Sequence, residues 1–451
     1  MGAPVDLKKR ANKKTNGLLK AEDIDDLNSQ HAIVMLGGKC VVLNEVIDPI
    51  FSRPDISFSS PGDFKTKYMN RKIYEETNTG ETKAHNAANL WLQHAKRREY
   101  AGIVFSPGKE VPGFYNLYRG LDVVPAKGGW HLFRKHLFEN ICSEEPEYFE
   151  YLLNWMADLV QNPGGLNGVS VVLRGGRGTG KGLFANSFGK IFGSHYLPIQ
   201  NQNHLVGKFN AHHKDALLIF ADECFWAGNK TSEGILKGLI TEDTIQVEAK
   251  GKDPIRVANH VHLVIASNED WVVPAGLDER RFFCLDVQEK HKQSIPYWNP
   301  IWEETRNGGI SAMLFDLMNR EYDPVALRTP PKTDALICQI EHSMTPIQKW
   351  WYQCLKDGRF SKDGFPWDGP IATETLHNSY LEFCKSINVQ WPEARNIFAA
   401  SIRKLSLAHS CRLPPPSMGK PRPHGLFFQE IGACRLKFES LVHGHLDWED
   451  D

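Results

Sequence analysis

Cysteine pairs, long apolar stretches and a dominant charge are all missing from this sequence of 451 residues. The nine cysteines are scattered, and no two of them stand at Cys-x2-Cys spacing. That distribution argues against a zinc ribbon and against a disulfide framework, and it is typical of reduced intracellular thiols. Lysine plus arginine (53) nearly balance aspartate plus glutamate (54), so any contact with nucleic acid must come from local basic patches.

No run approaches the roughly 18 apolar residues of a membrane span, and the sequence has no internal repeat or long low-complexity segment. Residues 1–17 are typical of a mobile basic leader, because no apolar segment stands behind the basic start. We therefore expect no membrane partner and a place in the cytosol, either of a bacterium or of an infected cell. The length predicts about three domains around a substantial core.

A phosphate-binding loop is the strongest motif in the chain. Its glycines let backbone N–H groups close around phosphate oxygens, its lysine adds a positive charge, and the helix behind it presents its N-terminus to the anion. Gly182, directly after the lysine, stands where a serine or threonine would normally supply a magnesium ligand. The loop, which predicts a bound nucleoside triphosphate, consists of Gly175, Gly176, Arg177, Gly178, Thr179, Gly180 and Lys181.

The central third of the chain alternates predicted strands and helices. Such alternation favours a parallel sheet with helices on its faces, and hence an α/β fold. Strands are expected at 169–173, 216–220, 261–266 and 282–287, and helices at 182–192 and 234–240.

The flanking regions have different patterns. Before the loop we expect a β-hairpin at 32–43 with a Gly37-Gly38 turn, and helices at 63–74, 87–94 and 146–161. After Pro330-Pro331, helices at 346–355, 373–387 and 393–407 and a hairpin from 425–428 and 433–438 would form a small winged-helix-like module. The chain is thus divided into an N-terminal α/β domain at 1–160, a central domain at 161–328 and a C-terminal DNA-binding module at 329–451.

An apolar strand at 217–221 ends in two carboxylates, Asp222 and Glu223. Ligands of parallel sheets bind at the carboxyl ends of the strands, so both acids are expected beside the phosphate loop. Asp222 would then hold magnesium, and Glu223 would polarise an attacking water as general base. The competing interpretation is a strand that merely stops at an acidic turn.

Two further positions carry candidate chemistry. Asn268 follows the strand at 262–267 and is suited to position water or contact a γ-phosphate, although asparagine is also an ordinary turn former. Arg280 and Arg281 precede the apolar run at 282–285 and either pair with neighbouring acids or act as an arginine finger on the γ-phosphate of another subunit. The finger requires an oligomer.

The order of these elements resembles that of the superfamily 3 helicases, which are AAA+ ring motors. The closer likeness is to the helicase half of phage, plasmid and poxvirus primase-helicases. It is specific across 151–287 and looser on both sides. The segments that carry it are 175–184, 209–210, 219–226, 236–242, 248–253, 265–271 and 278–287.

The resemblance implies roles for residues that are ambiguous alone. In that family a hairpin between the acidic strand and the asparagine strand holds the DNA backbone in the ring channel, and here Lys250 and Lys252 stand in that place. Lysines of this kind follow phosphates without reading bases, whereas the alternative is a solvated loop. Many members also have glycine at the position of Gly182. Magnesium would then rely on Asp222, phosphates and water, with Thr179 as a further candidate hydroxyl.

We therefore expect an ATP- and Mg2+-dependent DNA helicase that forms a hexameric ring on single-stranded or forked DNA. Family likeness implies 3′ to 5′ travel, replication of a phage or mobile element, and a primase, polymerase or loading factor as partner. One alternative is a primase-helicase with a priming site in 1–150. Another is a replication initiator that binds origin DNA through its C-terminal module and uses ATP as an assembly switch.

Overall fold

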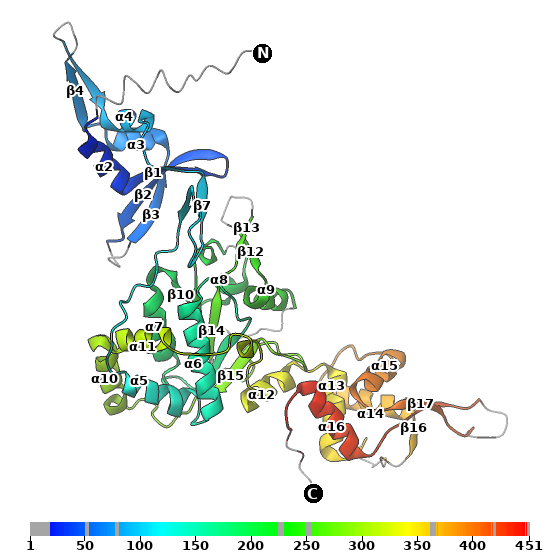
Figure 1. The fold of residues 1–451 in the computed structure, drawn as a ribbon. Coiled ribbons are helices and arrows are strands. Elements are labelled where there is room, and N and C mark those ends of the chain that lie inside the picture. The colour runs from blue at the N-terminus through cyan, green and yellow to red at the C-terminus, as the bar shows by residue number, and fades with distance from the viewer. Residues whose placement is uncertain are drawn as a thin grey trace, which may run out of the picture.

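The protein is described by a computed structural model that covers residues 19–49, 54–76, 81–208, 210–223, 230–248, 254–360, 367, 369–415, 417, 421–446 and 448. It is a mixed α/β protein in which three groups of elements follow one another along the chain (Figure 1). An N-terminal group with its own small sheets is followed by a parallel sheet surrounded by helices, and then by a smaller C-terminal module.

The N-terminal group is built on a four-stranded sheet with the order β3-β2-β1-β6. The expected hairpin is confirmed, since Gly37 and Gly38 take φ values of 57° and 74° between antiparallel β1 and β2. The helix expected at 63–74 is wrong in its second half. Helix α3 ends at Lys67, and β4 follows with a burial pattern of period two that suits a strand rather than a helix. The elements are α2 (Ala21–Gln30), β1 (His31–Leu36), β2 (Lys39–Ile47), β3 (Pro54–Ser59), α3 (Pro61–Lys67), β4 (Lys72–Glu76), β5 (Thr82–Asn86), α4 (Ala87–Gln93) and β6 (Glu99–Tyr100).

The central sheet has five strands in the order β10-β11-β14-β9-β15, and every neighbouring pair is parallel. All six residues of β14 are buried, as expected for a strand covered on both faces. The register pairs Arg174 with Ser267 and Asp222 with Ala266, so the carboxyl ends of three strands meet at one edge. The strands are β9 (Ser170–Arg174), β10 (Tyr196–Ile199), β11 (Leu218–Asp222), β14 (His262–Ser267) and β15 (Phe282–Asp286); β10 has no counterpart among the expected elements.

Helices cover this sheet. Helix α6 (Pro146–Gln161) has the expected bounds, and it packs on the sheet, where Trp155 Nε1 donates to the Val169 carbonyl at 2.9 Å. Its buried side chains share a hydrophobic cluster with β9 and β15. The other described helices of this group are α5 (His131–His136), η1 (Leu137–Ile141), α7 (Lys181–Gly189), η2 (Lys190–His195), α8 (Gln202–Val206), η3 (Ala211–His213), α9 (Lys230–Thr241), α10 (Ile295–Glu304), η4 (Thr305–Gly309), α11 (Ile310–Met318) and η5 (Ala326–Arg328).

Two small two-stranded sheets lie outside the central one. Strands β7 (Gly102–Val104) and β8 (Phe114–Asn116) are parallel and lie where the N-terminal group meets the central group (Figure 1). Strands β12 (Thr244–Val247) and β13 (Ile255–Ala258) are antiparallel and form the arms of the hairpin expected at 248–253. Its tip, with Lys250 and Lys252, lies outside the described residues, as does the leader at 1–17.

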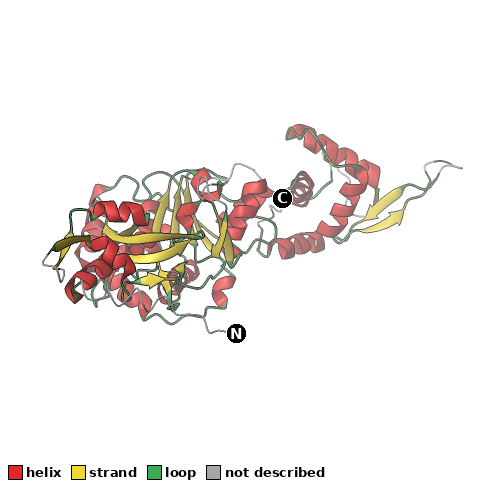
Figure 2. Ribbon diagram, turned by 90° about the horizontal axis from the view of Figure 1, so that it is seen from above, coloured by secondary structure: helices red, strands yellow, loops and turns green. Residues whose placement is uncertain are grey.

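The C-terminal module combines helices with a three-stranded antiparallel sheet in the order β16-β18-β17. In Figure 2 two strands project from its helices, away from the rest of the molecule. The second strand expected at 433–438 is wrong: this stretch lies in a helix, because Cys434, Phe438 and Val442 are buried at a spacing of four residues. The elements are α12 (Asp334–Ser343), α13 (Pro346–Asp357), β16 (Pro370–Ala372), α14 (Thr373–Ser386), α15 (Arg395–Leu405), β17 (His409–Arg412), β18 (His424–Phe427) and α16 (Ile431–Val442).

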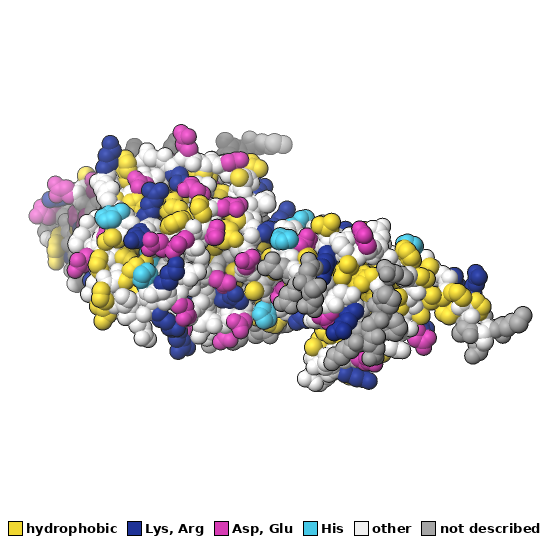
Figure 3. Space-filling view, turned by 90° about the horizontal axis from the view of Figure 1, so that it is seen from below, with side chains coloured by type: hydrophobic (Ala, Val, Ile, Leu, Met, Phe, Trp, Pro, Cys, Tyr) yellow, Lys and Arg dark blue, Asp and Glu magenta, His cyan; other side chains and the backbone are white. Residues whose placement is uncertain are grey.

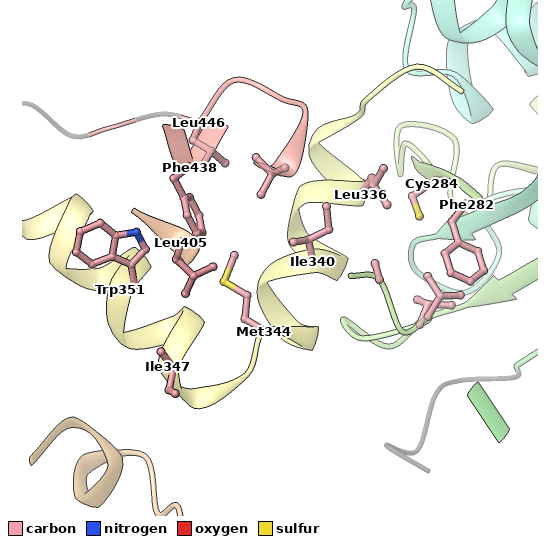
Figure 4. Close-up of a cluster of buried hydrophobic side chains, with 14 of the residues drawn as sticks. Phe282, Cys284, Leu336, Ile340, Met344, Ile347, Trp351, Leu405, Phe438 and Leu446 are labelled. Carbon is pink, nitrogen blue, oxygen red and sulfur yellow. The ribbon is translucent and has the colours of Figure 1, made fainter. Parts of the chain in front are cut away.

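Helix α12 joins the module to the central sheet. The hydroxyl of Thr333, its N-cap, accepts from Leu336 N and donates to the Cys284 carbonyl of β15 at 2.6 Å. The buried side chains of α12 belong to one cluster that runs from Phe282 on β15 to Phe438 on α16 (Figure 4). The two groups therefore share a continuous hydrophobic core. Within the described residues, no helix is long and apolar enough to cross a bilayer.

Candidate functional site

The phosphate loop joins the central strand β9 to helix α7, and its shape depends on glycine. Gly175, Gly178 and Gly180 take φ values of 155°, 74° and 94°, which side chains rarely adopt. A Cβ atom on Gly180 would also lie 2.5 Å from the ring of His136. Any other residue at Gly180 would thus clash as well as strain the backbone. The loop that results leads into the N-terminus of a nine-residue helix, which is suited to an anion.

Lys181 is the first residue of α7 and turns back into the loop. Its Nζ donates to the carbonyls of Gly175 and Gly176 at 2.5 and 2.8 Å, and its side chain is buried. Burial lowers the pKa of Lys181, while the nearby Asp222 carboxylate opposes that shift. The loop therefore already holds a cation whose only partners in it are carbonyl oxygens, and an incoming phosphate would be a stronger acceptor.

Asp222 and Glu223 leave the end of β11 in different environments. Asp222 is half-buried, and its pKa is raised first by burial and then by the neighbouring Glu223 carboxylate. Glu223 is exposed and has a φ of 54°, an uncommon conformation for a non-glycine residue. Its Oε1 lies 3.6 Å from a guanidinium nitrogen of Arg177 in the phosphate loop. The sheet thus brings both acids beside the phosphate loop, where the sequence predicted them.

One cavity of about 950 Å3 connects these groups. Asn268, which follows β14 and is exposed, reaches the same cavity as Lys181, Asp222 and Glu223. Gly182 also lines it, and a Cβ atom there would meet only the Asn186 amide nitrogen at 3.6 Å, so a side chain is sterically permitted. Four basic and two acidic side chains line the cavity, a balance that suits a polyanion: Arg177, Lys181, Lys190 and Arg306, with Asp222 and Glu223.

The donor set around Asp222 fits a hydrated magnesium ion brought in with phosphates. In the described residues no group of three or more His, Cys, Asp or Glu side chains could enclose a metal alone. A carboxylate beside a phosphate loop leaves most positions for nucleotide oxygens and water, which is how Mg2+ is commonly held. The Thr179 hydroxyl is engaged elsewhere, since it donates to the Gly176 carbonyl at 2.9 Å.

Arg280, Arg281 and the described arms of the hairpin lie away from this cavity. Arg281 precedes β15, and its carbonyl accepts from Ser170 N at the amino end of β9, opposite the edge that carries the phosphate loop. Its guanidinium pairs with the buried Glu279 at 3.3 Å, whereas Arg280 is exposed. The arms β12 and β13 likewise precede β14 and leave from its amino end. Among the described residues, neither these arginines nor the arms therefore line the cavity.

Part of the cavity wall was not predicted by any sequence motif. Ile295, Trp298, Trp302 and Arg306 line the cavity from α10 and η4, more than a hundred residues after the phosphate loop. Trp298 and Trp302 are one helical turn apart, and this spacing of two large aromatics is the signal from which that face could have been found.

The comparisons with known proteins agree with this architecture. Residues 173–281 match the model of a family of unknown function, DUF5906. A DNA primase-polymerase of Nitratiruptor phage NrS-1 is 24% identical over an alignment of 267 positions, which covers 55% of this chain and 37% of that protein. The chain therefore spans little more than a third of the curated relative's length.

Solved structures extend the likeness. An apo structure of the NrS-1 C-terminal region, residues 305–718, has a TM-score of 0.63 at 16% identity and covers 91% of this chain and 100% of that one. An A-form apo structure of that region has a TM-score of 0.60 and covers 86% of this chain and 96% of that one. This chain is thus similar in fold to the C-terminal region of a phage replication enzyme along most of its length.

Proposed function

We propose that this chain is the ATP-hydrolysing, DNA-translocating part of a phage replication protein of the primase-helicase type. One observation carries the proposal: Lys181, Asp222, Glu223 and Asn268 come from three parallel strand ends and line one cavity. The strand order, with the phosphate loop after β9, supports assigning the sheet to the P-loop AAA+ fold. The NrS-1 relative supports the phage replication context, and with it a site of action in the cytosol of an infected cell.

Each group has a role that its surroundings permit. Lys181 would exchange its carbonyl partners for β- and γ-phosphate oxygens, and the amides of residues 175–182 would bind the same phosphates. Asp222 would hold magnesium, which neutralises phosphate charge when bound with ATP. Glu223, exposed at the cavity, would orient and deprotonate the attacking water, and Asn268 would contact the γ-phosphate.

The trans arginine requires a ring, which we propose to be a hexamer. Arg280 and Arg281 lie at the amino edge of the sheet and not at their own cavity, which supports a role toward a neighbouring subunit. Arg280 is the stronger candidate, since Arg281 is already paired with Glu279. The hairpin that ends in Lys250 and Lys252 would enter the ring channel and follow single-stranded DNA.

The C-terminal module, proposed at 329–451, would bind duplex DNA near the fork. Residues 394–429 contain six lysines and arginines and no aspartate or glutamate. Helix α15 buries Phe398, Ile402 and Leu405 and exposes Arg403 and Lys404. A helix with a basic face beside a projecting β-hairpin is an arrangement that fits a duplex groove and its phosphates.

The comparisons favour the primase-helicase alternative over a stand-alone helicase, because the matched relative is a primase-polymerase. Priming by this chain is a second candidate function, tested by primer synthesis on a single-stranded template. An initiator that uses ATP only as a switch would bind ATP and DNA but would not displace a strand, so a strand-displacement assay separates it from a motor.

The decisive variant is Glu223→Gln. It should bind ATP and assemble but lose DNA-stimulated hydrolysis by about 100-fold or more, since the positioned base is removed. Glu303→Gln, an exposed change on α10, is the matched control and should retain turnover. Undiminished hydrolysis in Glu223→Gln would remove this residue from the mechanism.

A further inference from the structure

The cavity continues beyond the groups that would hold phosphates. Two helix faces form its remaining walls. On α7 and the start of η2, Leu183, Asn186 and Lys190 recur at intervals of three and four residues and so lie on one face. On α10 and η4, Trp298, Trp302 and Arg306 recur every four residues and also line the cavity. The two faces define a groove that begins at the phosphate loop.

The α10 wall has a fixed direction relative to that loop. Trp298 is its near end, because its indole lies 2.8 Å from where a Cβ atom of Gly180 would be. A helix rises about 1.5 Å per residue, so the wall extends roughly 12 Å from Trp298 to Arg306. That length is comparable to the distance from the phosphates of a nucleotide to the far side of its base.

The exposure of the wall changes along its length. Trp298 is buried, whereas Trp302 is 41% exposed and Ile295 is 66% exposed. Large apolar side chains that line a cavity together and remain exposed are a feature of ligand-binding grooves. The carboxylate of Glu304 on α10 does not line the groove. It accepts hydrogen bonds from the backbone N–H groups of Leu132 and Phe133.

We infer that this groove is the base and ribose subsite of the nucleotide site, with the aromatic base stacked on the indole of Trp302. The inference rests on the proposed function and adds the part of the ligand that the phosphate loop does not contact. Arg306 and Lys190, both exposed at the far end, would donate to the ribose hydroxyls and the base edge. A purine covers more of the indole than a pyrimidine, so ATP and GTP are preferred over CTP and UTP.

The test compares ligands with and without a base. Calorimetry would measure the binding of ATP, CTP and inorganic tripolyphosphate to the full chain and to Trp302→Ala. Loss of one stacking platform should weaken ATP about 5- to 100-fold and leave tripolyphosphate unchanged. Trp302→Phe, which keeps an aromatic face, should restore most of the affinity for ATP, and Trp391→Ala, at a tryptophan 87% exposed in the C-terminal module, is the matched control.

Several outcomes would overturn the inference. Equal weakening of ATP and tripolyphosphate would mean that Trp302 supports the phosphate loop, as would failure of Trp302→Phe to recover ATP binding. If Trp302→Ala does not fold, Arg306→Ala provides the same comparison of ligands, and an unchanged ATP affinity there would remove the far end of the groove. A wild-type chain that binds tripolyphosphate and ATP equally would refute the base subsite alone, whereas binding of neither would refute the nucleotide site itself.

Discussion

The central cavity and residues 394–429 of the C-terminal module differ in how their charged side chains are distributed and buried. Around the cavity, acids and bases alternate, and key members such as Lys181 and Asp222 are buried or half-buried. Figure 3 shows this mixture continuing over the surface of the central group, where positive and negative side chains are interspersed. Residues 394–429 instead have no acidic side chain, and their five described lysines and arginines are all exposed.

The difference predicts two kinds of sensitivity. A buried charge such as that of Lys181 acts at short range, and its loss is not compensated by its neighbours. On a convex basic surface every charge contributes a small, salt-screened amount, so losses are graded and additive. Substitutions of the same type should therefore have unequal effects in the two regions.

Lys181→Met should have the largest effect. It removes the buried ammonium that would bind the phosphates while keeping the side-chain length, and ATP hydrolysis should fall about 1,000-fold. The same change at exposed Lys404 should leave DNA-independent hydrolysis unchanged. Steady-state ATPase assays of both variants check the contrast, and equal losses would break it.

Acidification should separate the two regions by stability. Burial lowers the pKa values of His136 and His213, both in the central group, to about 4. Between pH 6.5 and 4 the unfolded chain then binds more protons than the folded one, so the stability present above pH 6.5 is lost as the pH falls. At pH 5.5 the two histidines together should cost about 3 kcal/mol.

Hydrogen exchange at pH 7.5 and 5.5, corrected for intrinsic rates, would measure this effect by region. The central sheet should lose protection, while the C-terminal module, whose His409 and His424 are exposed, should lose less. The double variant His136→Gln, His213→Gln should reduce the dependence of the central group but not abolish it, because burial also lowers the pKa of His262 on β14 to about 4. Equal loss in both regions would contradict the assignment.

Removal of basic charge from α15 should have a smaller, graded effect. Arg403→Gln with Lys404→Gln should weaken duplex binding about 5- to 10-fold at moderate salt and reduce the slope of log K against log salt by about 1.8. Fluorescence anisotropy over a salt series checks both values, with Lys385→Gln on α14 as control. A slope that does not change would show that neither side chain contacts phosphate.

The smallest effect is expected at Gly182→Ser. The position has room for the side chain, and serine replaces glycine in a helix with a gain of a few tenths of a kcal/mol. The added hydroxyl should lower the magnesium concentration needed for half-maximal hydrolysis by a small factor. A large loss of activity would show that the helix N-terminus approaches its ligand too closely for any side chain.

Short-range sequence patterns predicted the elements that depend on short-range interactions. The Gly37-Gly38 turn, helix α6 and the strand into the phosphate loop follow from turn chemistry, helical spacing and an apolar run. Strand β10 was not predicted because Tyr196–Ile199 is short and contains proline. Its position in the sheet depends on pairing with β11. The strand expected at 433–438 failed because a short apolar stretch suits either a strand or a helix until its partners are known.

The same limit applies to the candidate site. Lys181, Asp222 and Asn268 follow predictable strand ends, and a parallel sheet brings such ends together. Trp302 and Arg306 reach the cavity only through the packing of α10, and no spacing in the sequence relates them to the phosphate loop. The contact of His136 with Gly180 could not be predicted either, because a single buried histidine forms no recognisable sequence pattern.

Helix α12 has a mechanical consequence. Its ten residues extend about 15 Å, and its buried side is part of one core with β15 at one end and α13 and α16 at the other. Closely packed interiors transmit displacement rather than absorb it. A tilt of β15 would therefore swing the C-terminal module as a lever arm, with its greatest travel at the projecting hairpin of β17 and β18.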